Sequence, residues 1–185
     1  MSPGPSSPLT VLVVCTANIC RSPAAEVLLR RVYGPASGVS VTSAGLHART
    51  GEPMAPEMAR LLGVPPETVV AEQFTPEAAR RADLVLTMTR EHRSAVVTAV
   101  PAALRRTFTL RELSSLAQLL RTGDGLPTDV PPGEWLAALV EVAPPHRSRR
   151  TAGPDDDVED PYGRKPGVYA RVLEVLEECV AALAP

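Results

Sequence analysis

Hydrophobic and polar residues form two kinds of pattern along this chain, and they alternate. Short runs rich in Val, Leu and Thr are typical of strands, and they cover residues 11–14, 38–45, 83–88 and 106–110. Longer segments with apolar residues at helical spacing lie between and after them, at 22–31, 56–62, 75–82, 89–98, 111–120, 132–141 and 168–183. Strands that are separated by helices favour a parallel α/β sheet with right-handed crossovers.

The first strand leads into the stretch that carries the most chemical information. Val occupies three of the four positions 11–14, which is typical of a strand buried on both faces. A tight loop follows, and then an amphipathic helix with Ser22 as its expected N-cap and Pro23 in its first turn. Because free backbone N–H groups point outward where a strand passes through a loop into a helix, this segment predicts an anion site.

Two side chains of this loop indicate what is done with the anion. Arg21 carries a planar guanidinium that can bind two oxygens of a phosphate. Cys15 lies among N–H dipoles, a helix N-terminus and that guanidinium, an environment that favours its thiolate. A thiolate beside a bound phosphate is a nucleophile for phosphoryl transfer, and the alternative is an inert core thiol at a strand end.

Composition and charge limit the other possibilities. The chain has 185 residues and a net charge of −2, which suits one domain and gives no support for a nucleic-acid or membrane partner. No apolar run approaches the ~20 residues of a membrane span. Residues 1–8 are expected to form a disordered tail without signal-peptide features, and residues 9–185 a single domain. Three cysteines do not make a disulfide framework, so we expect a cytoplasmic protein.

The segment 15–23 reads Cys-Thr-Ala-Asn-Ile-Cys-Arg-Ser-Pro and directly follows a buried strand. It closely resembles the low-molecular-weight protein tyrosine phosphatases and their arsenate-reductase relatives, and the resemblance extends over nearly the whole chain. It implies a three-layer α/β sandwich, in which helices flank a four-stranded parallel sheet of order 2-1-3-4. That order places the loop at the carboxyl end of a central strand, where open α/β sheets bind ligands.

The pair Asp160-Pro161 matches the Asp-Pro pair that supplies the general acid of this family. A proton must reach the leaving oxygen, which otherwise departs as a poor alkoxide or phenoxide. Pro161 restricts Asp160 to extended backbone, and we expect the nearby anions to favour its protonated form. Two alternatives stay open: the acidic run 155–160 is a solvated loop, or Asp157 or Glu159 takes the role in a different loop register.

The reaction that this resemblance implies has two steps. The Cys15 thiolate attacks phosphorus in line, Arg21 and the loop amides hold the equatorial oxygens, and Asp160 protonates the leaving group. Water activated by Asp160 then hydrolyses the phosphocysteine, while Ser22 donates a hydrogen bond to the sulfur. The residues expected to bind the substrate beside the catalytic ones are Thr16, Ala17, Asn18, Ile19, Cys20, Ser22 and Tyr162.

Several residues of the loop carry further expectations. Asn18 tolerates left-handed backbone, and by the resemblance it hydrogen-bonds Ser43 and holds the loop in shape. Ala17 stands where the family commonly has Gly, so its φ is negative or strained. Cys20 is expected close enough to Cys15 for a reversible protective disulfide, with a buried spectator thiol as the alternative.

Residues outside the main motif receive weaker assignments. By the resemblance, His47 and Arg49 lie on the rim of the site and are candidates for substrate contact, with solvated loop residues as the alternative. His92 starts a helix and is interpreted as a solvated or capping residue. Cys179 is expected in the core, and the basic, Pro-rich segment 144–154 as a long loop.

The sequence thus predicts a protein-tyrosine-phosphatase-type hydrolase of phosphate monoesters. The expected substrate is a phosphotyrosine protein or a small aryl phosphate, no metal or cofactor is expected, and a monomer is the default. An arsenate reductase with a low-molecular-weight thiol is one alternative, although no resolving cysteine lies between Cys20 and Cys179. A non-catalytic phosphate-binding module is the other, and the presence of both Cys15 and Asp160 argues against it.

Overall fold

Four parallel strands form one sheet, and their order β2-β1-β3-β4 confirms the predicted topology. They are β1 (Leu9–Cys15), β2 (Val39–Gly45), β3 (Leu84–Thr87) and β4 (Thr107–Thr109). The computed structural model describes residues 8–122, 125–150 and 153–185. The predicted disordered tail lies outside the described residues, apart from Pro8.

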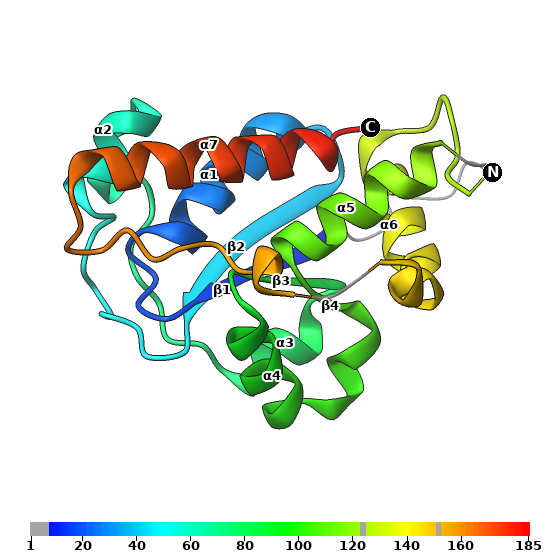
Figure 1. Cartoon of the computed structure of the whole chain (residues 1–185), viewed down its shortest axis with the longest axis horizontal. Helices are drawn as coiled ribbons and strands as arrows, with labels where there is room; N and C mark the ends of the chain where they lie inside the picture. The colour runs from blue at the N-terminus through cyan, green and yellow to red at the C-terminus, as the bar shows by residue number, and fades with distance from the viewer. Residues whose placement is uncertain (1–7, 123–124, 151–152) are drawn as a thin grey trace.

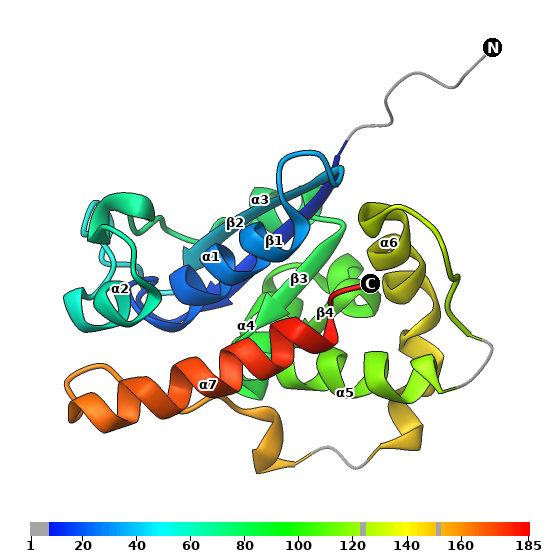
Figure 2. The same ribbon diagram turned by 90° about the horizontal axis from the view of Figure 1, so that it is seen from above.

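Helices cover both faces of this sheet and make the three layers (Figure 1). One face carries α1 (Arg21–Tyr33), α2 (Pro56–Leu62), α5 (Leu110–Arg121), α6 (Pro132–Val142) and α7 (Pro166–Ala182), and the other carries α3 (Pro76–Arg81) and α4 (Arg90–Ala99). The last helix, α7, packs against both α1 and α5 (Figure 2). Predicted and observed boundaries differ by no more than two residues, as at the start of α7. Within the described residues, no helix has the length and apolar character that a membrane span requires.

The side chains of β1 alternate between the two cores, as predicted for a strand buried on both faces. Val11, Val13 and Cys15 pack on the face of α1, whereas Leu12 and Val14 pack on the opposite face. β1 pairs in parallel with both β2 and β3, so Cys15 lies at the carboxyl end of a central strand. The fold therefore presents this residue where open α/β sheets bind ligands.

The predicted N-cap of α1 is wrong. Cys20 is the N-cap and makes no side-chain capping bond, while Ser22 lies inside the first turn. The reason is that the Ser22 hydroxyl is committed to the sulfur of Cys15, 2.9 Å away. With no side chain closing the helix, the backbone N–H groups of its first turn stay available for an anion.

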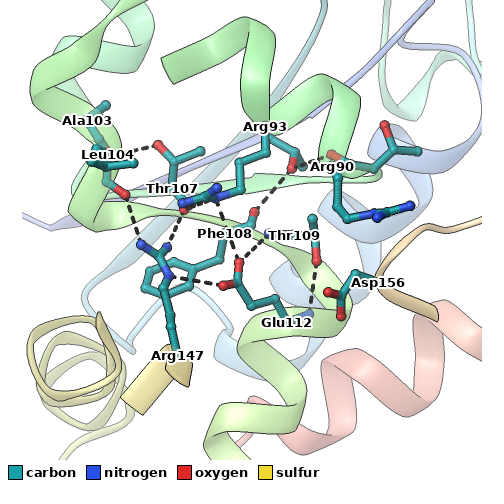
Figure 3. Close-up of polar contacts among 12 residues, drawn as sticks. Arg90, Arg93, Ala103, Leu104, Thr107, Phe108, Thr109, Glu112, Arg147 and Asp156 are labelled. Carbon is teal, nitrogen blue, oxygen red and sulfur yellow. Dashed lines mark hydrogen bonds and ion pairs between the residues drawn. The ribbon is translucent and has the colours of Figure 1, made fainter. Parts of the chain in front are cut away.

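The basic segment 144–154 is not the open loop that its composition predicts. It contains the 3-10 helix η3 (Pro144–Arg149) and the start of a second one, η4 (Pro154–Asp156). Arg147 fixes η3 to the edge of the sheet, as Figure 3 shows. Its guanidinium lies 4.1 Å from the Phe108 ring centroid, and its Nε donates to the Glu112 carboxylate at 3.0 Å.

Arg147→Met is expected to lower the free energy of unfolding by about 2–3 kcal/mol. Within the described residues, the largely buried Glu112 carboxylate pairs with Arg147 and with Arg93, and the variant leaves it only the pair with Arg93 at 3.8 Å. It also removes the donors that Arg147 gives to the carbonyls of Leu104 and Thr107. Urea unfolding measures the change, and Arg149→Met, an exposed position on the same 3-10 helix, should stay within about 0.5 kcal/mol of wild type. Equal changes in the two variants would refute the anchoring role.

Candidate active site

The loop between β1 and α1 surrounds the sulfur of Cys15 with hydrogen-bond donors. The side chain is 2% exposed, and its sulfur accepts the Asn18 backbone N–H at 3.3 Å. The Ser22 hydroxyl lies 2.9 Å away on another side. Hydrogen bonds that point at a sulfur stabilise its negative charge, so this environment suits a thiolate.

Asn18 holds the loop in shape from behind. Its backbone has a φ of 57°, and its buried side chain donates to Ser22 at 2.9 Å and to Ser43 at 2.8 Å. The predicted hydrogen bond between Asn18 and Ser43 is thereby confirmed, and the side-chain Oδ1 of Asn18 accepts the Glu72 backbone N–H. Since Asn18 supplies the hydrogen to Ser22, the Ser22 hydroxyl is free to donate its own hydrogen to Cys15.

The end of β2 packs directly on the backbone of this loop. A Cβ atom on Gly45 would lie 2.6 Å from the carbonyl oxygen of Thr16, which is closer than real contacts allow. The next residues follow the loop, because Leu46 and His47 donate their backbone N–H groups to the carbonyls of Cys15 and Thr16. Glycine at position 45 is thus required for the close approach of the two segments.

Ala17 and Cys20 are two further residues of the loop whose placement the structure gives. Among described non-glycine residues, only Asn18 and Asp129 have a positive φ, so Ala17 avoids the strained alternative. Cys20 is a buried free thiol, and burial, together with the charges of Asp160 and Cys15, raises its pKa to about 12. The reversible disulfide between Cys20 and Cys15 stays a prediction.

Arg21 is buried and joins the loop to the segment that carries Asp160. Its Nη1 donates to the Val158 carbonyl at 3.1 Å, and its Nη2 lies 2.5 Å from the Asp160 carboxylate. The Arg21 Nε is buried and has no partner in the parts of the chain that the structure describes. A buried guanidinium N–H without an acceptor is costly, and an oxygen of a bound phosphate would satisfy it.

The acidic run 155–160 is not solvated as a whole, because Asp156 is buried, although Asp155, Glu159 and Asp160 are exposed. Four of its carboxylates meet an arginine in the ion pairs Arg150–Asp156, Arg90–Asp157, Arg171–Glu159 and Arg21–Asp160. Asp157 also accepts the first backbone N–H of α4, and although burial opposes it, hydrogen bonding to Arg90 lowers the pKa of Asp157. Asp160 is the one member of this run that lines the pocket described next.

A small pocket of about 190 Å³ opens above the loop, lined by Cys15, Thr16, Ala17, Ile19, Cys20, Arg21, Asp160 and Tyr162. The Asp160 side chain is oriented by a local hydrogen bond, because its Oδ1 accepts the Tyr162 backbone N–H at 3.1 Å. On the rim, the Tyr162 hydroxyl contacts Arg49 from the loop after β2. His47 is exposed and does not line the pocket, and neither do the buried side chains of Asn18 and Ser22.

The sequence interpretation of His92 as a solvated or capping residue is wrong. Its side chain is 6% exposed, and its Nε2 lies 2.8 Å from the Thr16 hydroxyl on the pocket wall. Burial and the nearby Arg21 lower the pKa of His92 to about 4, although Asp160 and Asp157 oppose the shift. One signal could have found this contact: β3 lies beside β1, so the helix that follows β3 begins next to the loop.

Because of His92, the free energy of unfolding is expected to fall by about 2 kcal/mol when the pH is lowered from 7.5 to 4.5. The folded protein keeps the ring neutral down to about pH 4, whereas the unfolded chain takes up a proton near pH 6.5. The part of the free energy of unfolding that comes from the neutral His92 ring is therefore fully present above pH 6.5, and it is lost as the pH falls toward 4. Urea unfolding at both pH values should show a smaller loss for His92→Gln than for wild type, whereas His146→Gln should match wild type. Parallel losses in all three proteins would contradict the prediction.

The described residues include no group of three or more His, Cys, Asp or Glu side chains that could hold a metal ion.

Comparisons with known proteins identify relatives of this chain. A family model described as low molecular weight phosphotyrosine protein phosphatase matches residues 10–120. Etp of Escherichia coli (strain K12), a low molecular weight protein-tyrosine-phosphatase, is 41% identical over 102 residues, which cover 54% of this chain and 67% of Etp.

Two solved structures cover nearly the whole chain. The YwlE arginine phosphatase from Geobacillus stearothermophilus is 28% identical, covers 96% of this chain and 91% of its own, and has a TM-score of 0.67. A mutant of YwlE arginine phosphatase with a phosphorylated active site serine is 25% identical and has a TM-score of 0.69. The match covers 95% of this chain and 93% of the mutant's chain.

The fold, the loop and these similarities define the chain as a phosphatase, a hydrolase of phosphate monoesters. It belongs to the low molecular weight phosphotyrosine protein phosphatase family, whose model covers more than half of its length. The family resemblance of the sequence is thereby confirmed.

Proposed function

We propose that this phosphatase acts through a phosphocysteine intermediate on Cys15. The observation that carries the proposal is the meeting of a nucleophile, an anion-binding guanidinium and an acid in one small pocket, from Cys15, Arg21 and Asp160. The thiolate attacks phosphorus in line, while Arg21 and the loop N–H groups bind the equatorial oxygens.

Arg21 and Asp160 exchange partners when the substrate binds. In the structure, the Arg21 guanidinium pairs with the Asp160 carboxylate at 2.5 Å. A phosphoryl dianion beside the loop takes over the Arg21 donors. In this scheme Asp160 gives a proton to the leaving oxygen and then removes a proton from the attacking water.

The hydrogen bonds at the sulfur support both steps. The Asn18 N–H and the Ser22 hydroxyl stabilise Cys15 as an attacking thiolate and again as the leaving group in hydrolysis. The phosphorylated active site serine named for the YwlE mutant supports the proposal of a covalent intermediate.

The substrate class that we propose is a phosphotyrosine protein or a small aryl phosphate. Ile19 and Tyr162 give the pocket apolar walls on which an aromatic ring can pack, and Etp is named as a tyrosine phosphatase. A protein-arginine phosphatase is the second candidate. The protein-arginine-phosphatase of Geobacillus stearothermophilus matches this chain over 96% of its length at 28% identity, and this observation favours it.

Turnover of three substrates by the purified full chain, with a metal chelator present, tests the proposal. We expect hydrolysis of an aryl phosphate and of a phosphotyrosine peptide, and a much lower kcat/KM for a phosphoarginine peptide. The reverse preference would assign the second candidate. No turnover of any phosphorylated substrate would overturn the proposed function, and arsenate reduction with a small thiol would then be measured.

A further inference from the structure

We propose that His92 is a positioning residue that makes the Thr16 hydroxyl a hydrogen-bond donor to the phosphoryl group in the pocket. This inference rests on the proposed function of the same site. Neither the Thr16 nor the His92 side chain has a role in the two proposed steps. The inference places the ring hydrogen of His92 on Nε2.

The placement of that proton follows from the two ring nitrogens. At neutral pH the ring is uncharged, because burial and Arg21 lower its pKa to about 4, and it therefore carries one N–H. The Nε2 lies 2.8 Å from the Thr16 hydroxyl, whereas the Nδ1 is buried without a partner among the described residues. A buried N–H without an acceptor is the rarer and costlier arrangement, so the hydrogen belongs on Nε2. His92 then donates to Thr16.

The consequence concerns the hydrogen of the Thr16 hydroxyl. Its oxygen already accepts from His92, and no other hydrogen bond of this hydroxyl is present within the described chain. Thr16 lines the pocket next to Cys15, so its hydroxyl hydrogen can be directed at a bound ligand. The oxygens of a phosphoryl dianion are acceptors, which makes them the matching partner for this donor.

The ring is held firmly enough to impose this direction. His92 lies in the first turn of α4, and its backbone N–H is capped by the Thr89 hydroxyl at 3.1 Å. Asp157 accepts the backbone N–H of Arg90 at 2.7 Å in the same turn. The start of α4 is thus fixed from two sides, and the imidazole is buried against the loop.

Kinetics of paired variants test the inference on an aryl phosphate. We expect Thr16→Val and His92→Leu each to lower kcat/KM about 10-fold and to raise the inhibition constant of inorganic phosphate by a similar factor. The double variant should be no worse than either single variant, because the two side chains act as one unit. Thr16→Ser and His92→Gln keep the hydroxyl and a donor near the Nε2 position, so they should restore most of the activity. His146→Leu, on η3 away from the pocket, should leave both constants unchanged.

Nitrogen-15 NMR of the histidine side chains in the wild-type protein is a second test, and it needs no variant to fold. We expect His92 to show a protonated Nε2 and a bare Nδ1 at neutral pH. The opposite tautomer, or additive losses in the double variant, would overturn the inference while wild-type turnover leaves the proposed function intact. An unchanged inhibition constant in Thr16→Val would overturn it as well. Failure of the wild type itself to turn over would instead count against the proposed function.

Discussion

Cys15→Ser is expected to lower kcat/KM for an aryl phosphate by about 10⁴-fold or more. A serine hydroxyl stays protonated at neutral pH, and a protonated hydroxyl is a poor nucleophile toward phosphorus. The groups beside the sulfur are the Asn18 N–H and the Ser22 hydroxyl, which stabilise a negative charge but are not bases. Steady-state hydrolysis with a chelator present measures the loss.

Phosphate binding separates the loss of the nucleophile from damage to the loop. The donors for an anion are Arg21 and the loop backbone, so Cys15→Ser should bind inorganic phosphate within about threefold of wild type. Isothermal titration measures this affinity. Cys179 is buried on α7, as predicted, and Cys179→Ala is the matched control that should keep wild-type turnover. Turnover that persists in Cys15→Ser would place the nucleophile elsewhere.

The sequence predicted the centre of the site because its parts are local. Cys15, Arg21 and the first turn of α1 lie within one short stretch, and the order of residue types in that stretch already specifies a strand, an anion loop and a helix. The contact between Asn18 and Ser43 came from the family resemblance. It holds because β1 and β2 pair in parallel along their whole length.

The parts that the sequence missed depend on side-chain contacts that residue type alone does not specify. Thr16 and His92 are separated by 76 positions and meet only because β1 and β3 are adjacent in the sheet. Ser22 has the residue type of an N-cap, but its contact with the Cys15 sulfur overrides that local preference. A tertiary contact decides the outcome at each of these positions.

Charge runs are ambiguous in a sequence for a related reason. A stretch of arginines or aspartates has the same composition whether water or an opposite charge is its partner. The acidic run 155–160 finds arginines from α1, α4 and α7, and Arg147 in the basic segment finds Glu112 on α5. These pairs hold the segment that carries Asp160, so the basic segment before it helps to position the proposed acid.

Asp160→Asn is expected to lower kcat/KM by about 10²- to 10³-fold for substrates with a poor leaving group. The amide keeps the size of the side chain, and its one acceptor oxygen can accept from either Arg21 or the Tyr162 N–H, but it has no acidic proton to give. The loss should shrink toward about 10-fold or less for an aryl phosphate whose phenolate leaves readily without a proton.

A series of aryl phosphates with increasing phenol pKa measures this dependence, because kcat/KM reports the step that forms the phosphocysteine. Wild type should show a shallow slope against the leaving-group pKa, and Asp160→Asn a steep one. Asp157→Asn is the matched control, since Asp157 pairs with Arg90 and does not line the pocket, and its slope should stay shallow. A loss in Asp160→Asn that is equal for every leaving group would mean that Asp160 only shapes the pocket, and the proton would have to come from another group or from water.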